Sequence, residues 1–120
     1  MGIHKTAIVD KDAEIGSEVN IGPFSIIEKG TVISDNTIIH SGVVIKAGTQ
    51  IGKDCEIHHG AVLGDVPQDI KFKGEKSYLN IGNATQIREY ATLHRASGEG
   101  EKTVIGKAVV TLPSRSSLAG

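Results

Sequence analysis

Three histidines in this sequence are spaced as though they belonged to one repeating surface. His4, His40 and His58 are separated by multiples of eighteen residues. In a chain that winds with that period they would share one face, with His40 and His58 directly stacked. Imidazole pairs are common metal ligands, so a metal site or an inter-subunit site is one interpretation. Chance placement at outward corners is the other, and His59 lies on the opposite side of the strand.

A second set of polar side chains is clustered further along the chain. Gln68, Asp69 and Lys71 lie in one short polar stretch, and His94 closes a later one. Such groups can hydrogen-bond or ion-pair with a ligand, but charged residues in a loop are more often ordinary solvated surface. His94 follows an inward-pointing position, so we expect it to face outward. It would share a face with His4, His40 and His58 only if the residues between them preserve the eighteen-residue period.

A six-residue repeat predicts the elements that position these side chains. Reading every sixth residue from Ile3 gives only aliphatic side chains as far as Leu63: Val9, Ile15, Ile21, Ile27, Ile33, Ile39, Ile45, Ile51 and Ile57 lie between them. Four positions after each of these aliphatics stands a small or modest side chain, such as Cys55, which should pack inward. A helix needs apolar spacings of three and four, so this period predicts short strands with a corner in each hexad, as in parallel β-helices.

The repeat is interrupted twice and then ends. If the six-residue register continued, positions 69 and 75 would be aliphatic, but the sequence has Asp69 and Glu75 there. An unpaired carboxylate in a narrow apolar interior is very costly. We therefore expect residues 65–80 to be extruded as a loop, with a second loop at 97–102. The predicted repeat domain spans residues 1–106, and residues 107–120 form a tail that departs from the pattern. Loops on a rigid scaffold often carry function.

Composition and charge exclude several classes of partner. A formal net charge of −1 gives no electrostatic reason to expect nucleic acid or an anionic membrane. No stretch is long enough to form a transmembrane segment. The single cysteine cannot form an internal disulfide, and no leader-like segment opens the chain, so a cytoplasmic location is expected.

The sequence resembles one family of hexapeptide-repeat enzymes. IGPF at 21–24, PQDIKFKGE at 67–75 and IREYATLHR at 87–95 are similar to strings in bacterial UDP-N-acetylglucosamine O-acyltransferases of lipid A synthesis, over residues 3–106. The resemblance implies an all-β fold, a left-handed parallel β-helix with three hexads per coil, and a homotrimer. It also implies transfer of an (R)-3-hydroxyacyl chain from acyl carrier protein to the sugar 3-hydroxyl, with no cofactor.

The same resemblance suggests roles for the second set of polar residues. Gln68, Asp69, Lys71 and His94 would line the substrate cleft. Asp69 would hydrogen-bond sugar hydroxyls, Lys71 would meet the acyl-pantetheine or a phosphate, and His94 would contact the nucleotide sugar. No metal ligand is implied.

One feature of the family has no counterpart in these 120 residues. The family places its catalytic base in a stretch of the form M-x-x-x-H-[VI]-A-H-[DN]-C, shortly after the position matching Thr103–Gly106, where this chain has its tail. We therefore expect no catalytic histidine and little or no activity. The alternatives are another hexapeptide acyltransferase, a non-catalytic β-helix, and a γ-type carbonic anhydrase that would need three histidines on zinc.

Overall fold

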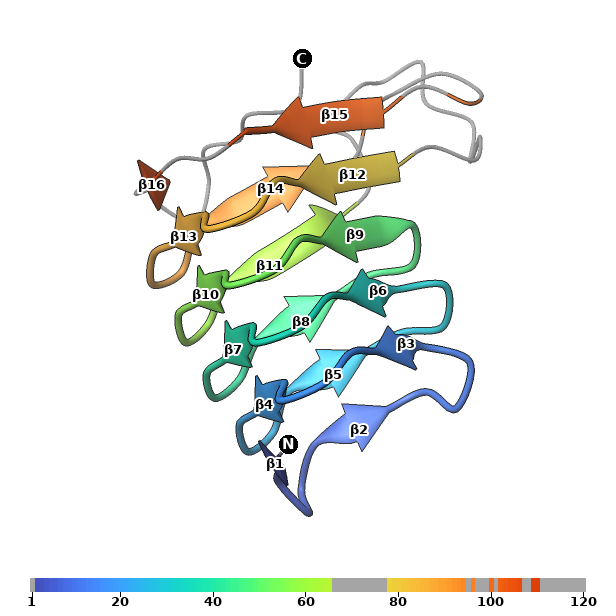
Figure 1. Ribbon diagram of the computed structural model, residues 1–120, viewed down its shortest axis with the longest axis vertical. Coiled ribbons are helices and arrows are strands. Elements are labelled where there is room, and N and C mark those ends of the chain that lie inside the picture. The colour runs from blue at the N-terminus through green and yellow to red at the C-terminus, as the bar shows by residue number, and fades with distance from the viewer. Residues whose placement is uncertain are drawn as a thin grey trace.

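The structure is a computed structural model that describes residues 2–65, 78–94, 96, 100, 102–106 and 109–110. All of the regular elements in these ranges are short β-strands, and they form three parallel sheets (Figure 1). No helix capable of crossing a membrane is found among the described residues. The predicted all-β architecture is confirmed.

Successive strands are assigned to the three sheets in rotation, so each coil contributes one strand to each sheet. The first sheet contains β1 (Gly2–Ile3), β4 (Asn20–Ile21), β7 (Ile38–Ile39), β10 (Glu56–Ile57), β13 (Gln86–Ile87) and β16 (Val109–Val110). The second contains β2 (Ile8–Val9), β5 (Ile26–Ile27), β8 (Val44–Ile45), β11 (Val62–Asp65) and β14 (Thr92–His94). The third contains β3 (Glu14–Ile15), β6 (Val32–Ile33), β9 (Thr49–Ile51), β12 (Tyr78–Ile81) and β15 (Lys102–Ile105).

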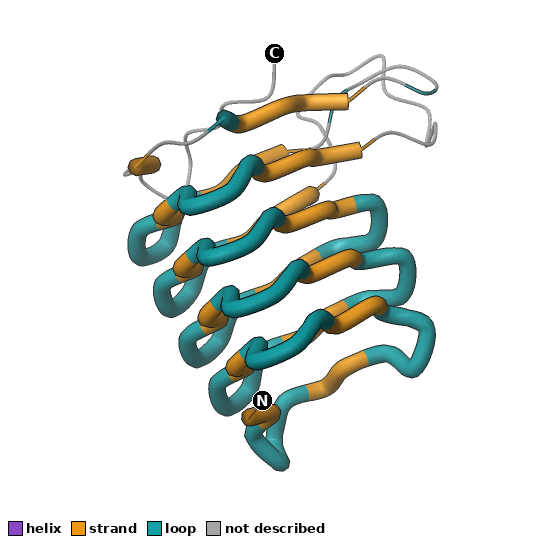
Figure 2. Tube along the Cα trace, viewed as in Figure 1, coloured by secondary structure: helices purple, strands orange, loops and turns teal. Residues whose placement is uncertain are grey.

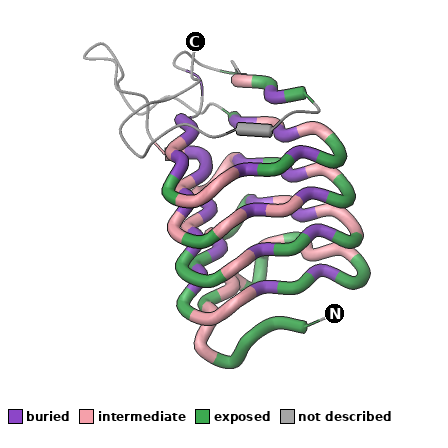
Figure 3. Tube along the Cα trace, turned by 90° about the vertical axis from the view of Figure 1, so that its left-hand side faces the viewer, coloured by how far each residue is buried: buried purple, intermediate pink, exposed green. Residues whose placement is uncertain are grey.

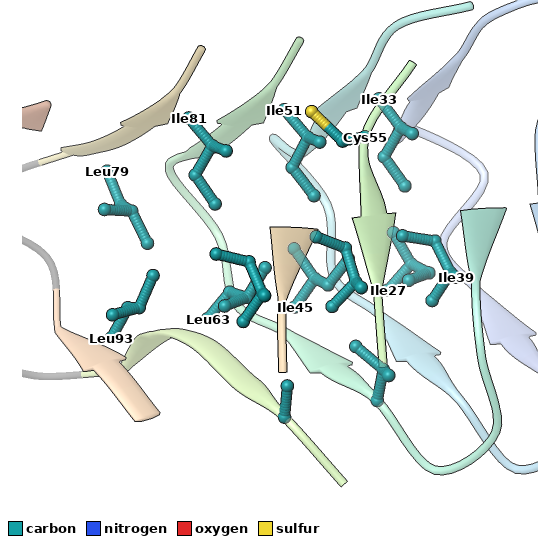
Figure 4. Close-up of a cluster of buried hydrophobic side chains, with 14 of the residues drawn as sticks. Ile27, Ile33, Ile39, Ile45, Ile51, Cys55, Leu63, Leu79, Ile81 and Leu93 are labelled. Carbon is teal, nitrogen blue, oxygen red and sulfur yellow. The ribbon is translucent and has the colours of Figure 1, made fainter. Parts of the chain in front are cut away.

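The aliphatic ladder predicted from the sequence forms the core. Each inward residue pairs with its equivalent one coil away, as Ile21 does with Ile3 and Ile39. Most of these side chains are almost fully buried, and Figure 4 shows how they stack on one another. Burying one such side chain contributes about 1.5–3 kcal/mol, so the ladder is the main source of stability. The first coil lies at the end of the stack, where Figure 3 shows exposed and half-buried residues, and Ile3 is 43% exposed.

The small inward positions link neighbouring coils by hydrogen bonds. The hydroxyl of Ser25 donates to the carbonyl of His40 at 2.8 Å, and that of Thr37 donates to the carbonyl of Gly52 at 2.8 Å. Cys55 occupies the same kind of position with 1% of its surface exposed. A buried hydroxyl needs such a partner, so these small inward positions accept polar side chains that can reach the backbone of the next coil.

The corners between strands require an unusual backbone conformation. The corners are turns that connect the strands (Figure 2), and at the second turn residue of most of them φ is positive, which glycine adopts without strain. Glycine fills the position at residues 30, 42, 48 and 60, but six corners place another residue there: Glu18, Phe24, Asn36, Asp54, Ala84 and Tyr90. These six residues carry backbone strain that the stacked coils must offset.

The first interruption lengthens a coil without breaking the stack. Glu56 pairs with Gln86, thirty residues further on, so this coil holds twelve more residues than the eighteen of a regular one. Strand β11 extends to Asp65 and β12 begins at Tyr78, so both ends of the expected 65–80 loop are strand. Leu79 is fully buried and pairs with Thr49, an inward position that we did not predict.

The described chain continues in strand form beyond residue 106. Val110 in β16 pairs with Ile87, whereas the hexad count places the next inward position one residue later, at Thr111. Residues 107–108 and 111–120 lie outside the described part, so the extent of the predicted tail stays a prediction.

Candidate functional site

Both interruptions of the repeat leave and rejoin the helix at the same corner. Strands β11 and β14 are neighbours in the second sheet and end at Asp65 and His94, which are paired in register. Strands β12 and β15 are neighbours in the third sheet and begin at Tyr78 and Lys102, which are also paired. We call this corner, after β11 and β14 and before β12 and β15, the loop corner.

A β-bulge shapes the loop corner. The register between β11 and β14 shifts between Leu63 and Asp65, so Gly64 is the extra residue that leaves Asp65 beside His94. Gly64 has a φ of 80°, and a Cβ on it would collide with the side chain of Thr49. Bulges of this kind redirect side chains next to functional sites. Sequence reasoning missed both Gly64 and Asp65, although the glycine after an inward aliphatic was a visible signal.

His94 is buried, which corrects our expectation that it would face outward. It exposes 5% of its surface, and Ala96 beside it exposes 8%. Strict alternation of inward and outward residues holds where a regular two-residue turn follows the strand. Here the bulge at Gly64 pairs His94 with Asp65, and the backbone N–H of Ala96 donates to the carbonyl of Tyr78 at 3.4 Å.

The other three predicted site residues lie outside the described residues. Gln68, Asp69 and Lys71 fall between residues 66 and 77, which the structure does not describe, so their predicted roles stay predictions. The flanking residues Asp65 and Tyr78 are the described positions nearest to them in the sequence.

The predicted histidine stack is confirmed for two of its members. The rings of His40 and His58 lie 4.8 Å apart between centroids and are nearly parallel, at 8°. Gly22 occupies the coil between His4 and His40, where a Cβ would come within 2.8 Å of the His40 carbonyl carbon. The three histidines therefore do not form one continuous stack.

Arg88, rather than His94, continues this column above His58. Because the lengthened coil holds twelve extra residues, the residue that pairs with Ile57 is Ile87, thirty positions later. The residue after it, Arg88, therefore lies above His58. Its guanidinium lies 3.0 Å from Nε2 of His58 and 3.3 Å from a carboxylate oxygen of Glu89. A hydrogen bond from its own backbone N–H lowers the pKa of the Glu89 carboxyl, and the neighbouring Arg88 charge lowers it further.

His59 and Tyr90 form a separate contact on the adjacent corner. Their rings meet edge to face at 89° with centroids 5.2 Å apart, and Tyr90 also covers Gly60. His59 is thus directed away from His58, as the sequence predicted. Two residues of the IREYATLHR string, Arg88 and Tyr90, have structural contacts in the coil below.

Cys55 is a packing residue, as the sequence predicted. Its sulfur lies 3.1 Å from the carbonyl oxygen of Gly82, and burial raises the pKa of the thiol above its usual value. A thiolate is therefore disfavoured at this position.

The described loop corner can present buried and half-buried polar groups to a ligand. Tyr78 is exposed, Asp65 is half-buried and His94 is buried, all at the ends of stacked strands. These elements are rigid because each strand is paired on both sides or packed on the core. A site here would thus be positioned by strands.

Comparisons with known proteins agree with this arrangement. The family model described as bacterial transferase hexapeptide (six repeats) matches residues 30–65. An acyl-[acyl-carrier-protein]–UDP-N-acetylglucosamine O-acyltransferase from Sulfurihydrogenibium sp. is 62% identical over 95 residues, covering 79% of this chain and 35% of the relative. One from Chlorobaculum parvum is 55% identical over 104 residues, covering 87% of this chain and 39% of the relative.

Solved structures give the same result. LpxA from Acinetobacter baumannii superimposes with a TM-score of 0.85 at 43% identity, covering 91% of this chain and 44% of that protein. The UDP-N-acetylglucosamine acyltransferase from Bacteroides fragilis gives a TM-score of 0.83 at 40% identity, covering 86% of this chain and 40% of that protein.

This chain spans between 35% and 44% of the length of these relatives. The likeness nevertheless extends over most of its own residues. By sequence and by fold, the chain is a left-handed parallel β-helix that belongs to the acyl-[acyl-carrier-protein]–UDP-N-acetylglucosamine O-acyltransferase family and corresponds to the N-terminal part of its members.

Proposed function

We propose that this chain supplies part of the substrate cleft of an acyltransferase. The reaction moves an (R)-3-hydroxyacyl chain from acyl carrier protein to the 3-hydroxyl of UDP-N-acetylglucosamine, as the first step of lipid A synthesis. The names of the relatives state an acyl carrier protein donor and a UDP-N-acetylglucosamine acceptor.

The convergence at the loop corner is the observation that carries this proposal. Asp65 and His94 are paired at the ends of adjacent strands, and the PQDIKFKGE string begins two residues after Asp65. The two sequence strings that are most specific for the family therefore both adjoin the loop corner. Separate surface features would have no reason to meet there.

In this proposal the loop residues bind and orient the substrates. Asp69 accepts hydrogen bonds from sugar hydroxyls, Lys71 meets a phosphate or the acyl-pantetheine, and Gln68 lies beside them. His94, because it is buried and held in a strand, presents one ring edge to the nucleotide sugar. A buried imidazole in a rigid strand orients a ligand more sharply than a solvated one.

We propose that none of the five histidines of this chain is the catalytic base, which the resemblance places in a segment that these 120 residues lack. His40 and His58 are engaged with each other and with Glu56 and Arg88 on a different corner, and His59 contacts Tyr90. Attack by a sugar hydroxyl on a thioester needs a positioned base, which contributes about 10²–10⁴-fold. The 120-residue chain alone should therefore turn over at least that much more slowly than a chain that carries the base.

Assembly as a homotrimer in the cytoplasm is part of the same proposal. The outward residues of the second sheet form an aliphatic row in register, made of Ile8, Ile26, Val44 and Val62. Ile8 is 64% exposed and Ile26 is 38% exposed, so a row of this kind would gain stability by packing against another subunit. The unpaired, buried cysteine fits a reducing compartment.

A chimaera tests the proposal. Residues 1–106 would replace the matching part of the Sulfurihydrogenibium relative, and transfer of a radiolabelled hydroxyacyl group to UDP-N-acetylglucosamine would be measured. We expect turnover in the chimaera, at least a tenfold loss with Asp69→Ala, and none detectable in the 120-residue chain. A folded, trimeric chimaera without activity would overturn the proposed function.

A further inference from the structure

A compact group of ligand atoms lies on the corner that follows the first sheet, away from the loop corner. One nitrogen each from His40 and His58 and a carboxylate oxygen of Glu56 lie within 4.8 Å of one another. Among the described residues, this is the one such group of three histidine, cysteine or acidic side chains. All five histidines of the chain fall within the described residues, so no other imidazole competes unseen.

We propose that His40, Glu56 and His58 bind one divalent cation of the late first-row transition metals, with zinc as the reference ion. This site is separate from the proposed acyltransferase cleft and does not depend on it. Two imidazoles and one carboxylate form a donor set that zinc, nickel, cobalt and copper prefer over calcium or magnesium.

The present distances are close to those of a coordinated ion. Oε2 of Glu56 lies 2.7 Å from Nε2 of His40 and 3.8 Å from Nε2 of His58. In a tetrahedral zinc site with metal–ligand bonds of about 2.1 Å, neighbouring donor atoms lie roughly 3.4 Å apart. Both distances from the Glu56 oxygen thus differ by less than about an ångström from that spacing.

The nitrogen of His58 that faces Glu56, Nε2, is already the unprotonated one, as coordination requires. Arg88 lies 3.0 Å from Nε2 of His58, and a guanidinium can only donate, so Nε2 must be the unprotonated nitrogen. The proton is then on Nδ1, which faces a carboxylate oxygen of Glu89 at 3.8 Å. A carboxylate behind the distal nitrogen is the usual support of a metal-binding histidine.

Two side chains must rearrange for the ion to enter, and Nε2 of His40 must release to solvent, or pass to Nδ1, the proton that it now donates to Glu56. The stacked rings are parallel, so their lone pairs run side by side and one ring has to turn out of the stack. His40 is the ring that can turn, because 39% of its side chain is exposed against 14% for His58. Arg88 must leave Nε2 of His58, and Glu89, already 3.3 Å away, can receive the guanidinium.

Calorimetric titration of the untagged chain with zinc tests this site. We expect saturable binding of one ion per chain, and binding at least tenfold weaker in each of His40→Gln, His58→Gln and Glu56→Gln. His59→Gln and His4→Gln are matched controls, because they remove an imidazole that lies beside the cluster or elsewhere on the same column, and each should bind within about twofold of the parent. Glu89→Gln should weaken binding by about tenfold through the supporting contact.

Two further measurements keep the result interpretable. Circular dichroism establishes that each variant folds, and Glu56→Gln tests the site without altering either ring of the stack. Cobalt should give a visible absorption band in the parent chain that is lost in His58→Gln and retained in His59→Gln. Absence of saturable zinc binding at millimolar zinc, or equal binding by parent, His40→Gln and His58→Gln, would overturn the proposal.

Discussion

The α-carbon of Gly64 faces the side chain of Thr49 so closely that no methyl group fits between them. This contact lies beneath the loop corner, where the bulge leaves Asp65 beside His94. The Thr49 hydroxyl is buried and has no hydrogen-bond partner among the described residues. Moving this side chain away from an added methyl would therefore bring no change of hydrogen-bond partner that could offset the cost.

Gly64→Ala should therefore destabilise the chain more than its backbone angle alone explains. A non-glycine residue at positive φ costs about 1–2 kcal/mol, and a methyl forced into a packed site costs about 1–3 kcal/mol more. Gly42→Ala is the matched control, because Gly42 has a φ of 65° and nothing within 4 Å of the added methyl. Urea unfolding of both variants measures the difference, and equal losses of unfolding free energy would show that the contact with Thr49 has no effect.

Ala84→Gly should stabilise the chain, although glycine usually weakens a folded structure. Ala84 has a φ of 58°, at a corner position that glycine occupies in other coils. Relief of about 1–2 kcal/mol of strain outweighs the ~0.5–1 kcal/mol entropic cost of glycine. Ala61→Gly, at a fully buried position with no positive φ, is the control and should be destabilising. A lower midpoint of thermal unfolding for Ala84→Gly would contradict the argument.

Cys55 should react with thiol reagents only when the chain unfolds. Burial raises the pKa of the thiol, so at neutral pH the folded chain holds even less thiolate than an exposed cysteine would. A raised pKa in the folded state also means that the unfolded state releases its proton first, so stability should fall as pH rises above about 9. Ellman's reagent measures the reactivity, and the alkaline loss of stability should be smaller in Cys55→Ala. Rapid labelling of the folded chain would show that the Cys55 thiol becomes exposed to solvent without unfolding.

Asp69→Ala should reduce the affinity for UDP-N-acetylglucosamine. We expect millimolar binding by the 120-residue chain, and loss of one polar contact costs on the order of 1–3 kcal/mol, or about 5- to 150-fold. Saturation-transfer NMR measures the response, with Asp12→Ala, an exposed residue in the first coil, as the control. Equal signals from the parent chain and Asp69→Ala would remove Asp69 from the site.

Ile26→Lys should prevent assembly of the chain. Its side chain lies in the aliphatic row on the second sheet, and a lysine there would place an unpaired charge in the proposed interface. Ile38→Lys is a closely matched control on the first sheet, since Ile38 and Ile26 are 39% and 38% exposed. Light scattering should give a monomer for the first variant and a trimer for the second. A monomeric parent chain would refute the trimer itself.

The ladder and the His40–His58 stack could be predicted because both depend only on the repeat period. The burial of His94 and of Leu79 could not, because it depends on the bulge at Gly64 and on the residue at which β12 begins. The contact between Arg88 and His58 was missed for a related reason. It depends on how many residues the first interruption removes from the stack, and the period does not give that number.

The lengthened coil also shows where this architecture tolerates change. Twelve extra residues between Glu56 and Gln86 leave the pairing of Ile57 with Ile87 intact, because adjacent coils are aligned by their strands and not by residue count. An insertion of one residue inside a strand would instead exchange inward and outward side chains along that side. New segments of almost any length can thus be grafted at a corner, where closing a longer loop costs little extra free energy, while the interior remains as it was.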